Sequence, residues 1–157
     1  MGSPNTSKYV RGFSFIEILV VMGIFVILGT LSLFVSMDTY HGSNFRSDRD
    51  LVVTLLQHAR AQAMHNICTG TCTDGKPHGV YIGSGTYTVF QGSSYATRDV
   101  AEDQTYTANS TLVATGDSEV VFANVTGVVS ASRTITLTAE QNSTITVDPS
   151  GRISWTN

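Results

Sequence analysis

The most constraining feature of this chain is a long apolar stretch near its N-terminus. Residues 13–37 are 25 positions with a single ionisable side chain, Glu17. About 20 apolar residues suffice to cross a bilayer as an α-helix, so this stretch predicts a transmembrane helix surrounded by membrane lipid. A secretory signal would have a shorter apolar region, of about 7–15 residues, followed by a small-residue cleavage site that we do not find here.

The charges on the two sides of this span predict its orientation. Lys8 and Arg11 precede the span, which favours a cytoplasmic N-terminus and an extracytoplasmic remainder. After Met37 the chain carries seven Lys and Arg against eleven Asp and Glu, a net charge of −4. Nucleic-acid binding needs clustered positive charge, so a broad electrostatic surface for DNA is not expected.

The helix is predicted to continue beyond the span, through residues 38–67. No proline occurs between Pro4 and Pro77, so nothing forces the helix to stop before about Asn66. Apolar residues recur at helical spacing in its second half, which predicts one face that packs on another element. These residues are Val52, Leu55, Leu56, Ala59 and Ala63.

Residues 68–157 have the pattern of an antiparallel β-domain, with short alternating runs separated by turn residues. The threonines of the strands should face solvent, and the apolar residues should face the helix. Residues 93–109 should form a surface loop. The expected fold class is therefore α+β, a long N-terminal helix on a C-terminal sheet. We expect strands at 78–82, 86–91, 111–115, 119–123, 125–130, 133–139, 143–148 and 151–155.

The start of the apolar stretch resembles the processing motif of type IV prepilins and type II secretion pseudopilins. The matching residues are Gly12-Phe13-Ser14-Phe15-Ile16-Glu17-Ile18-Leu19-Val20-Val21. The resemblance implies a leader at 1–12, cleavage after Gly12 by a prepilin peptidase and N-methylation of Phe13. It also implies the type IV pilin fold, other pilin or pseudopilin subunits as partners, and an inner-membrane assembly platform.

Glu17 also has a physical argument of its own. A carboxylate in hydrocarbon costs several kcal/mol unless it is paired or protonated. The new amine of Phe13 in a neighbouring subunit is a suitable cation at similar depth, which would make Glu17 an assembly residue. The alternative is a glutamate tolerated near the cytoplasmic end of an ordinary anchor.

A second resemblance covers most of residues 68–157 and points to the GspH/FimT group of minor pilins and pseudopilins. It rests on 55–63, on 79–82 and on 145–153. Some members of that group bind DNA through a C-terminal Gly-Arg-x-Arg element, which makes Arg152 a possible DNA-binding residue. Ser154 stands where the second arginine would be, and the alternative is a terminal strand with packed Trp155 and solvated Arg152.

The two cysteines lie close together in the sequence. Cys68 and Cys72 are expected to form a short disulfide, which suits an oxidising exterior. With His65 and His78 they also make a conceivable zinc set, although the spacing matches no common zinc module. Two free thiols are the remaining alternative.

No cofactor or enzyme activity is expected, because no nucleophile motif, phosphate-binding loop or dinucleotide fingerprint is evident. Asp99, Glu102 and Asp103 form a conceivable calcium site or a solvated loop. Three functions remain: a structural filament subunit of a pilus or pseudopilus, a DNA-capturing pilin for natural transformation, and a single-span protein that keeps residues 1–12.

Overall fold

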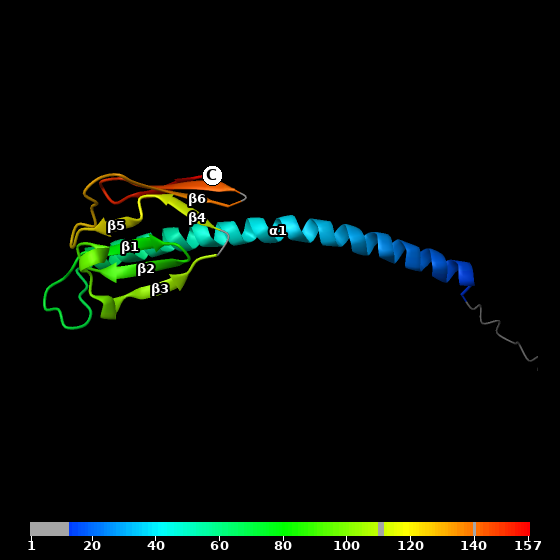
Figure 1. The fold of residues 1–157 in the computed structure, drawn as a ribbon, viewed down its shortest axis with the longest axis horizontal. Coiled ribbons are helices and arrows are strands. Elements are labelled where there is room, and N and C mark those ends of the chain that lie inside the picture. The colour runs from blue at the N-terminus through cyan, green and yellow to red at the C-terminus, as the bar shows by residue number, and fades with distance from the viewer. Residues whose placement is uncertain (1–12, 110–111, 140) are drawn as a thin grey trace, which may run out of the picture. The chain divides into compact units, whose positions relative to one another are not determined.

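The computed structural model describes residues 13–109, 112–139 and 141–157, and within these it leaves out the side chains of 31–43. The predicted leader, 1–12, lies outside the described residues. Helix α1 (Phe15–Met64) comes first in the chain, and strands follow it (Figure 1). Contacts divide the chain between Thr39 and Tyr40 into two units. We call the second, Tyr40–Asn157, the β unit.

Helix α1 ends in a motif that its sequence encodes. Asn66 has a φ of 52°, the left-handed conformation that asparagine tolerates better than most residues. The amide of Ile67 donates to the carbonyl of Gln62 at 3.0 Å, and that of Asn66 donates to Ala63 at 3.0 Å. This pair of bonds is the Schellman arrangement, which satisfies the last carbonyls and redirects the chain.

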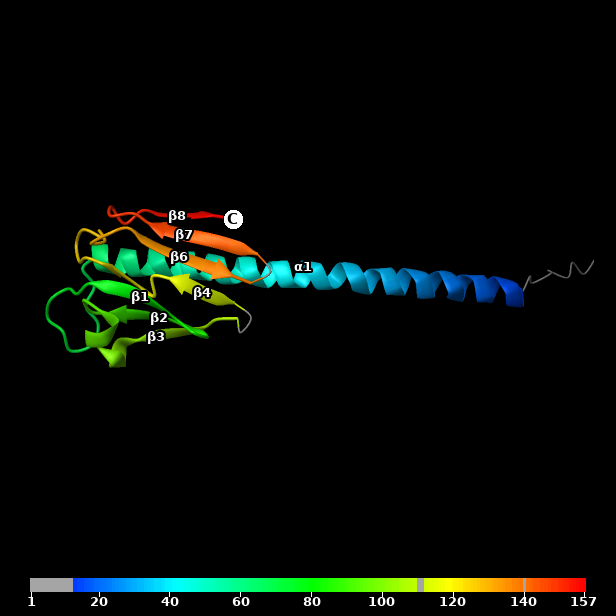
Figure 2. The ribbon, with the colours of Figure 1, turned by 45° about the horizontal axis from the view of Figure 1, so that its top comes forward.

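The β unit contains two antiparallel sheets of four strands each, and Figure 2 shows them on either side of the C-terminal part of α1. Sheet A has the order β3-β2-β1-β5 and sheet B the order β4-β6-β7-β8. The strands of sheet A are β1 (His78–Gly83), β2 (Thr86–Gln91), β3 (Gln104–Thr107) and β5 (Glu119–Phe122); those of sheet B are β4 (Val113–Gly116), β6 (Arg133–Thr138), β7 (Asn142–Val147) and β8 (Ile153–Thr156).

The core lies between α1 and the two sheets. All five apolar residues predicted on the packing face of the helix are buried, with Leu56 fully inaccessible. Sheet B contributes alternate residues, and its threonines lie on the other face or are only partly buried. The period-2 pattern therefore sets which face meets the helix, as expected. The sheet residues are Ile135, Leu137, Ile145 and Val147.

Three expectations for the strands are wrong. The segment 93–109 is not a plain loop, because it contains two short 3-10 helices, η1 (Tyr95–Thr97) and η2 (Val100–Glu102), and strand β3, which pairs with β2. Residues 125–130 form no strand, since Val125 has a φ of 65° and its amide donates to Ala63 at the end of α1. The strands also form two sheets where one was expected.

Candidate assembly site

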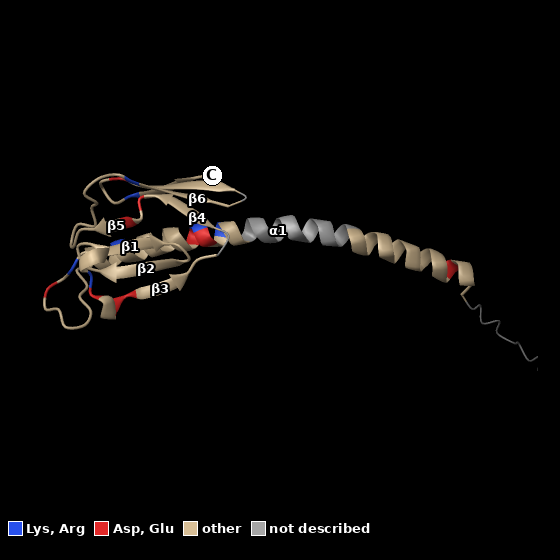
Figure 3. Cartoon of the chain, viewed as in Figure 1, with Lys and Arg blue, Asp and Glu red and all other residues tan. Residues whose placement is uncertain are grey.

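The first turn of α1 places Glu17 near the start of the helix. The carbonyl of Ser14 accepts hydrogen bonds from the amides of Glu17 at 3.0 Å and of Ile18 at 3.3 Å. A negative charge in the first turn is favoured by the helix dipole. Glu17 is the one charged side chain among residues 13–30, and Figure 3 shows this part of α1 as otherwise uncharged.

The apolar side chains of this segment are exposed. Phe13 is 79% exposed and Phe25 is 68% exposed. A shallow hollow on one helical face is lined by Phe13, Glu17 and residues spaced three and four apart as far as Phe25. A contiguous exposed apolar surface of this kind indicates a surface that contacts lipid or other protein.

Two expectations about this segment reach beyond the described residues. Gly12, the residue before the predicted cut, lies outside the described residues. Phe13, the residue after the cut, is the first one that the structure describes. In the part of the chain with described side chains, no helix has both the length and the apolar character needed to cross a bilayer. The side chains of 31–37, the end of the predicted span 13–37, belong to the part left out.

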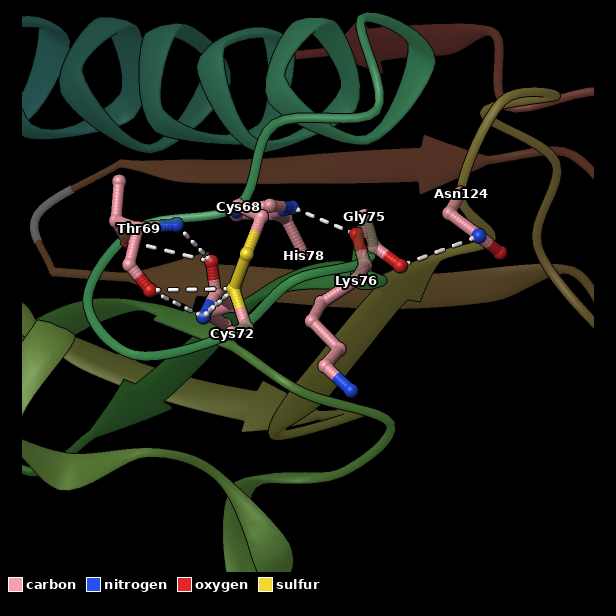
Figure 4. The surroundings of a disulfide bond; sticks show 8 residues. Cys68, Thr69, Cys72, Gly75, Lys76, His78 and Asn124 are labelled. Atoms are coloured by element: carbon pink, nitrogen blue, oxygen red, sulfur yellow. Dashed lines mark hydrogen bonds between the residues drawn. A yellow bond between two sulfur atoms is a disulfide. The ribbon is translucent and has the colours of Figure 1, made fainter.

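A loop held by a disulfide follows α1. The structure joins Cys68 to Cys72, as Figure 4 shows. Gln91, only 4% exposed, accepts at Oε1 from the amide of Thr69 at 2.8 Å and donates from Nε2 to the Thr69 carbonyl at 3.2 Å. The sequence analysis did not identify Gln91. Its signal was a polar amide at the end of a strand, directly after Val89 and Phe90.

His78 and His65, the other members of the conceivable zinc set, differ in their surroundings. His78 is 3% exposed, and its Nδ1 lies 3.0 Å from the Lys76 carbonyl. Burial lowers the pKa of His78 below its ordinary value, which favours the neutral ring. His65 is exposed at the end of α1. Among the side chains that the structure describes, no three His, Cys, Asp or Glu groups are grouped as for a metal ion.

Removing the disulfide is expected to lower the stability of the β unit by about 2 kcal/mol, the value for closing so short a loop. The variant Cys68→Ser with Cys72→Ser should therefore unfold at a lower temperature than the parent chain, measured by circular dichroism in detergent. A reductant should reproduce the loss in the parent chain and leave the variant unchanged. Equal unfolding temperatures would contradict the expectation.

Asp99 and Asp103, from the acidic segment 99–103, have partners of their own. Asp103 pairs with Arg98 at 2.7 Å, and the Asp99 side chain accepts from the amide of Ala101 at 3.2 Å. Arg98 also lies over the ring of Tyr95, 3.6 Å from its centre, and Tyr95 stacks on Tyr81 with 3.8 Å between ring centroids. This stack holds the η1–η2 segment against sheet A.

Arg152, the possible DNA-binding residue, lies at the turn between β7 and β8. Its side chain is 79% exposed, and its Nε lies 3.3 Å from Asp148 Oδ2. The Ser150 hydroxyl and the Arg152 amide donate to Asp148 and lower the pKa of that carboxyl. Trp155 is 45% exposed, and the Ser154 hydroxyl donates to the Thr146 carbonyl at 3.4 Å. The arginine is therefore accessible, but an aspartate accompanies it.

Comparisons with known proteins bear on the N-terminal segment and on the fold. Residues 7–33 match the family described as the prokaryotic N-terminal methylation motif. No curated protein matches the chain. The crystal structure of the type IV minor pilin FimU of Pseudomonas aeruginosa, strain PAO1, is similar with a TM-score of 0.55 and 15% sequence identity, over 71% of this chain and 92% of that one.

The structural similarity confirms the predicted fold class, a long helix packed on an antiparallel β-domain, as the type IV pilin fold. The motif match confirms the predicted resemblance of the N-terminal segment and implies a membrane-anchored precursor. The chain therefore carries an N-terminal methylation motif at residues 7–33 and has the fold of type IV pilins.

Proposed function

We propose that this chain is a structural subunit, either a minor pilin of a type IV pilus or a pseudopilin of a type II secretion pseudopilus. The observation that carries the proposal is the exposed apolar surface at the start of α1, with Glu17 as its one charge. In the proposed pathway a prepilin peptidase cuts between Gly12 and Phe13 and methylates the new amine. The subunit then leaves the membrane through an inner-membrane assembly platform.

The proposed assembly step uses two kinds of contact. Exposed side chains such as Ile16 and Leu19 pack against neighbouring helices, as they would against lipid. The Glu17 carboxylate pairs with the Phe13 amine of a neighbouring subunit, which removes the cost of an unpaired charge in apolar surroundings and sets the stagger between subunits. The filament with which the chain copurifies would distinguish a pilus from a secretion system.

Replacing Glu17 by alanine is expected to uncouple assembly from processing. The variant should still carry N-methyl-Phe13, seen by mass spectrometry of the N-terminus from native membranes, because the residues around the cut are unchanged. Its amount in the sheared filament fraction should fall at least about tenfold, because a loss of only ~1.4 kcal/mol in the free energy of assembly lowers the equilibrium tenfold.

The matched control is Asp50→Ala, which removes an exposed carboxylate from the same helix within the β unit. That variant should assemble like the parent chain. Normal filament content of the Glu17→Ala variant would contradict the assigned role of Glu17, and an N-terminus that still includes residues 1–12 in the parent chain would contradict the proposed function itself.

Binding of DNA is the second candidate function, and the accessibility of Arg152 and Trp155 is the observation in its favour. The net charge of −4 after Met37 and the neighbouring Asp148 weigh against it. We expect no gel shift of single-stranded DNA by the full chain in detergent at low salt. A shift that Arg152→Ala removes, and that the control Arg46→Ala keeps, would overturn this expectation and favour a competence pilus.

A further inference from the structure

A short sequence pattern recurs in this chain, and the proposed assembly step does not use it. Asparagine followed two residues later by serine or threonine, with a residue other than proline between them, occurs at 5–7, 109–111, 124–126 and 142–144. This is the acceptor pattern for N-linked glycosylation of exported proteins. Serine and threonine are frequent in this chain, so the pattern alone selects none of the four copies, and the structure has to separate them.

The copy at 142–144 lies at the start of strand β7. Alternate residues of a strand point to opposite faces, so Asn142 and Thr144 share one face and Ser143 lies on the other. Asn142 is exposed and Thr144 is half-buried, whereas Ser143 is 1% exposed and its hydroxyl donates to the Thr156 carbonyl at 2.9 Å. The fold therefore presents the asparagine amide and the threonine hydroxyl together on the outer face of sheet B.

The four copies differ in how accessible the asparagine nitrogen is. The Asn142 side chain makes no hydrogen bond to any residue that the structure describes. Asn124 is exposed, but its Nδ2 donates to the Gly75 carbonyl at 3.4 Å, as Figure 4 shows. Asn109 is half-buried, and residues 110–111 lie outside the described residues, as does the copy at 5–7 in the predicted leader. Asn142 is therefore the copy whose nitrogen is best placed to react.

The face around Asn142 is uncharged and rich in hydroxyl groups. Strands β6 and β8 pair with β7 on its two sides, and Thr144 lies opposite Thr136 of β6 and Thr156 of β8. A sugar attached to Asn142 would lie beside hydroxyl groups that both donate and accept hydrogen bonds. Besides Asn142 and Thr144, the outward residues of these three strands are Thr134, Thr136, Thr138, Thr146, Ser154 and Thr156.

We propose that Asn142 carries an N-linked glycan. The donor is a lipid-linked oligosaccharide activated by pyrophosphate, because the β unit is expected on the side of the membrane opposite the cytoplasmic nucleotide sugars. The Nδ2 nitrogen of Asn142 forms a bond to C1 of the first sugar. The bond from C1 to the pyrophosphate oxygen breaks, and the lipid pyrophosphate leaves with that electron pair.

One of the two amide protons passes to a base of the transferase, and the nitrogen keeps the other. The hydroxyl of Thr144, on the same face as Asn142, is the second group that the transferase recognises. This inference needs export of the β unit but not its assembly into a filament, so it goes beyond the proposed function.

The test is mass spectrometry of the chain purified from its native membranes and cut with trypsin. Residues 134–152 form one tryptic peptide, which contains Asn142, and residues 99–133 form another, which contains Asn109 and Asn124. The peptide 134–152 is expected to carry the mass of a glycan, and electron-transfer fragmentation should place that mass on Asn142. An unmodified peptide 134–152, or a glycan located on one of its serines or threonines, would overturn the inference.

Variants of Thr144 separate recognition of the acceptor pattern from an effect on folding. Thr144→Val removes the hydroxyl and keeps the branched shape, so the glycan should disappear from the peptide 134–152, whereas Thr144→Ser should keep it. The matched control is Thr146→Val, the same change two residues along on the same face, and its glycan content should equal that of the parent chain.

A glycan that survives Thr144→Val, or one that Thr146→Val removes equally, would contradict the inference. The proposed function is scored separately by the N-terminus of the same sample. An unglycosylated chain that carries N-methyl-Phe13 would overturn the glycan at Asn142 and leave the proposed function in place.

Discussion

Replacing Gly12 by aspartate is expected to leave the chain at its full 157-residue length in the membrane, without N-methyl-Phe13. The predicted cut lies between Gly12 and Phe13. Glycine has no side chain, so the backbone at this position can approach the peptidase closely. Aspartate adds both bulk and a charge next to the scissile bond. Processing should fall from nearly complete to undetectable, measured as the intact mass of the membrane-extracted chain.

The control for this variant is Gly2→Asp, which places the same side chain elsewhere in the predicted leader. Its mature product should be identical in mass to that of the parent chain, because the substituted residue is removed. Normal mature mass for the Gly12→Asp variant would show that the cut lies elsewhere. A full-length product from both variants and from the parent would instead favour a single-span protein that keeps residues 1–12.

The parts of the fold that could be predicted are those with local causes. Thr134 to Thr138 alternates threonine with Ile135 and Leu137, so the period of two alone sets which face is buried. The hairpin between β1 and β2 follows from Gly83-Ser84-Gly85, since Gly85 supplies a φ of +83° in a two-residue loop. In the N-terminal segment, Glu17 stood out because a charge in an apolar run is costly.

The parts that could not be predicted depend on contacts between distant residues. Nothing in residues 113–122 indicates that β4 joins one sheet and β5 the other, because both strands read as short alternating runs. Gln91 lies on a strand with the expected pattern, and the role of its amide becomes visible only when the fold brings Thr69 of the Cys68–Cys72 loop beside it. Side-chain contacts of this kind therefore depend on the tertiary structure.

The largest effect on the β unit is expected from Gly151→Ala. Gly151 is buried with a φ of +79°, and a β-carbon there would fall on the carbonyl oxygen of Gly127 and 2.9 Å from Nε of Arg60. The left-handed conformation costs an alanine about 1–2 kcal/mol, and overpacking against the backbone adds about 1–3 kcal/mol. We expect a loss of roughly 2–5 kcal/mol, seen as a fall of about 10 °C or more in the unfolding temperature.

Gly85→Ala separates the two causes of this loss. Gly85 has a φ of +83°, nearly that of Gly151, but a β-carbon there would meet no atom within 4 Å. That variant should lose only the conformational part, about 1–2 kcal/mol. If the two variants lose the same free energy of unfolding, contact with Gly127 and Arg60 does not contribute to the loss. If Gly151→Ala loses more stability, as we expect, Gly151 is needed to close the end of sheet B on α1. The presence of a glycine directly before Arg152 then has a structural reason that does not require DNA.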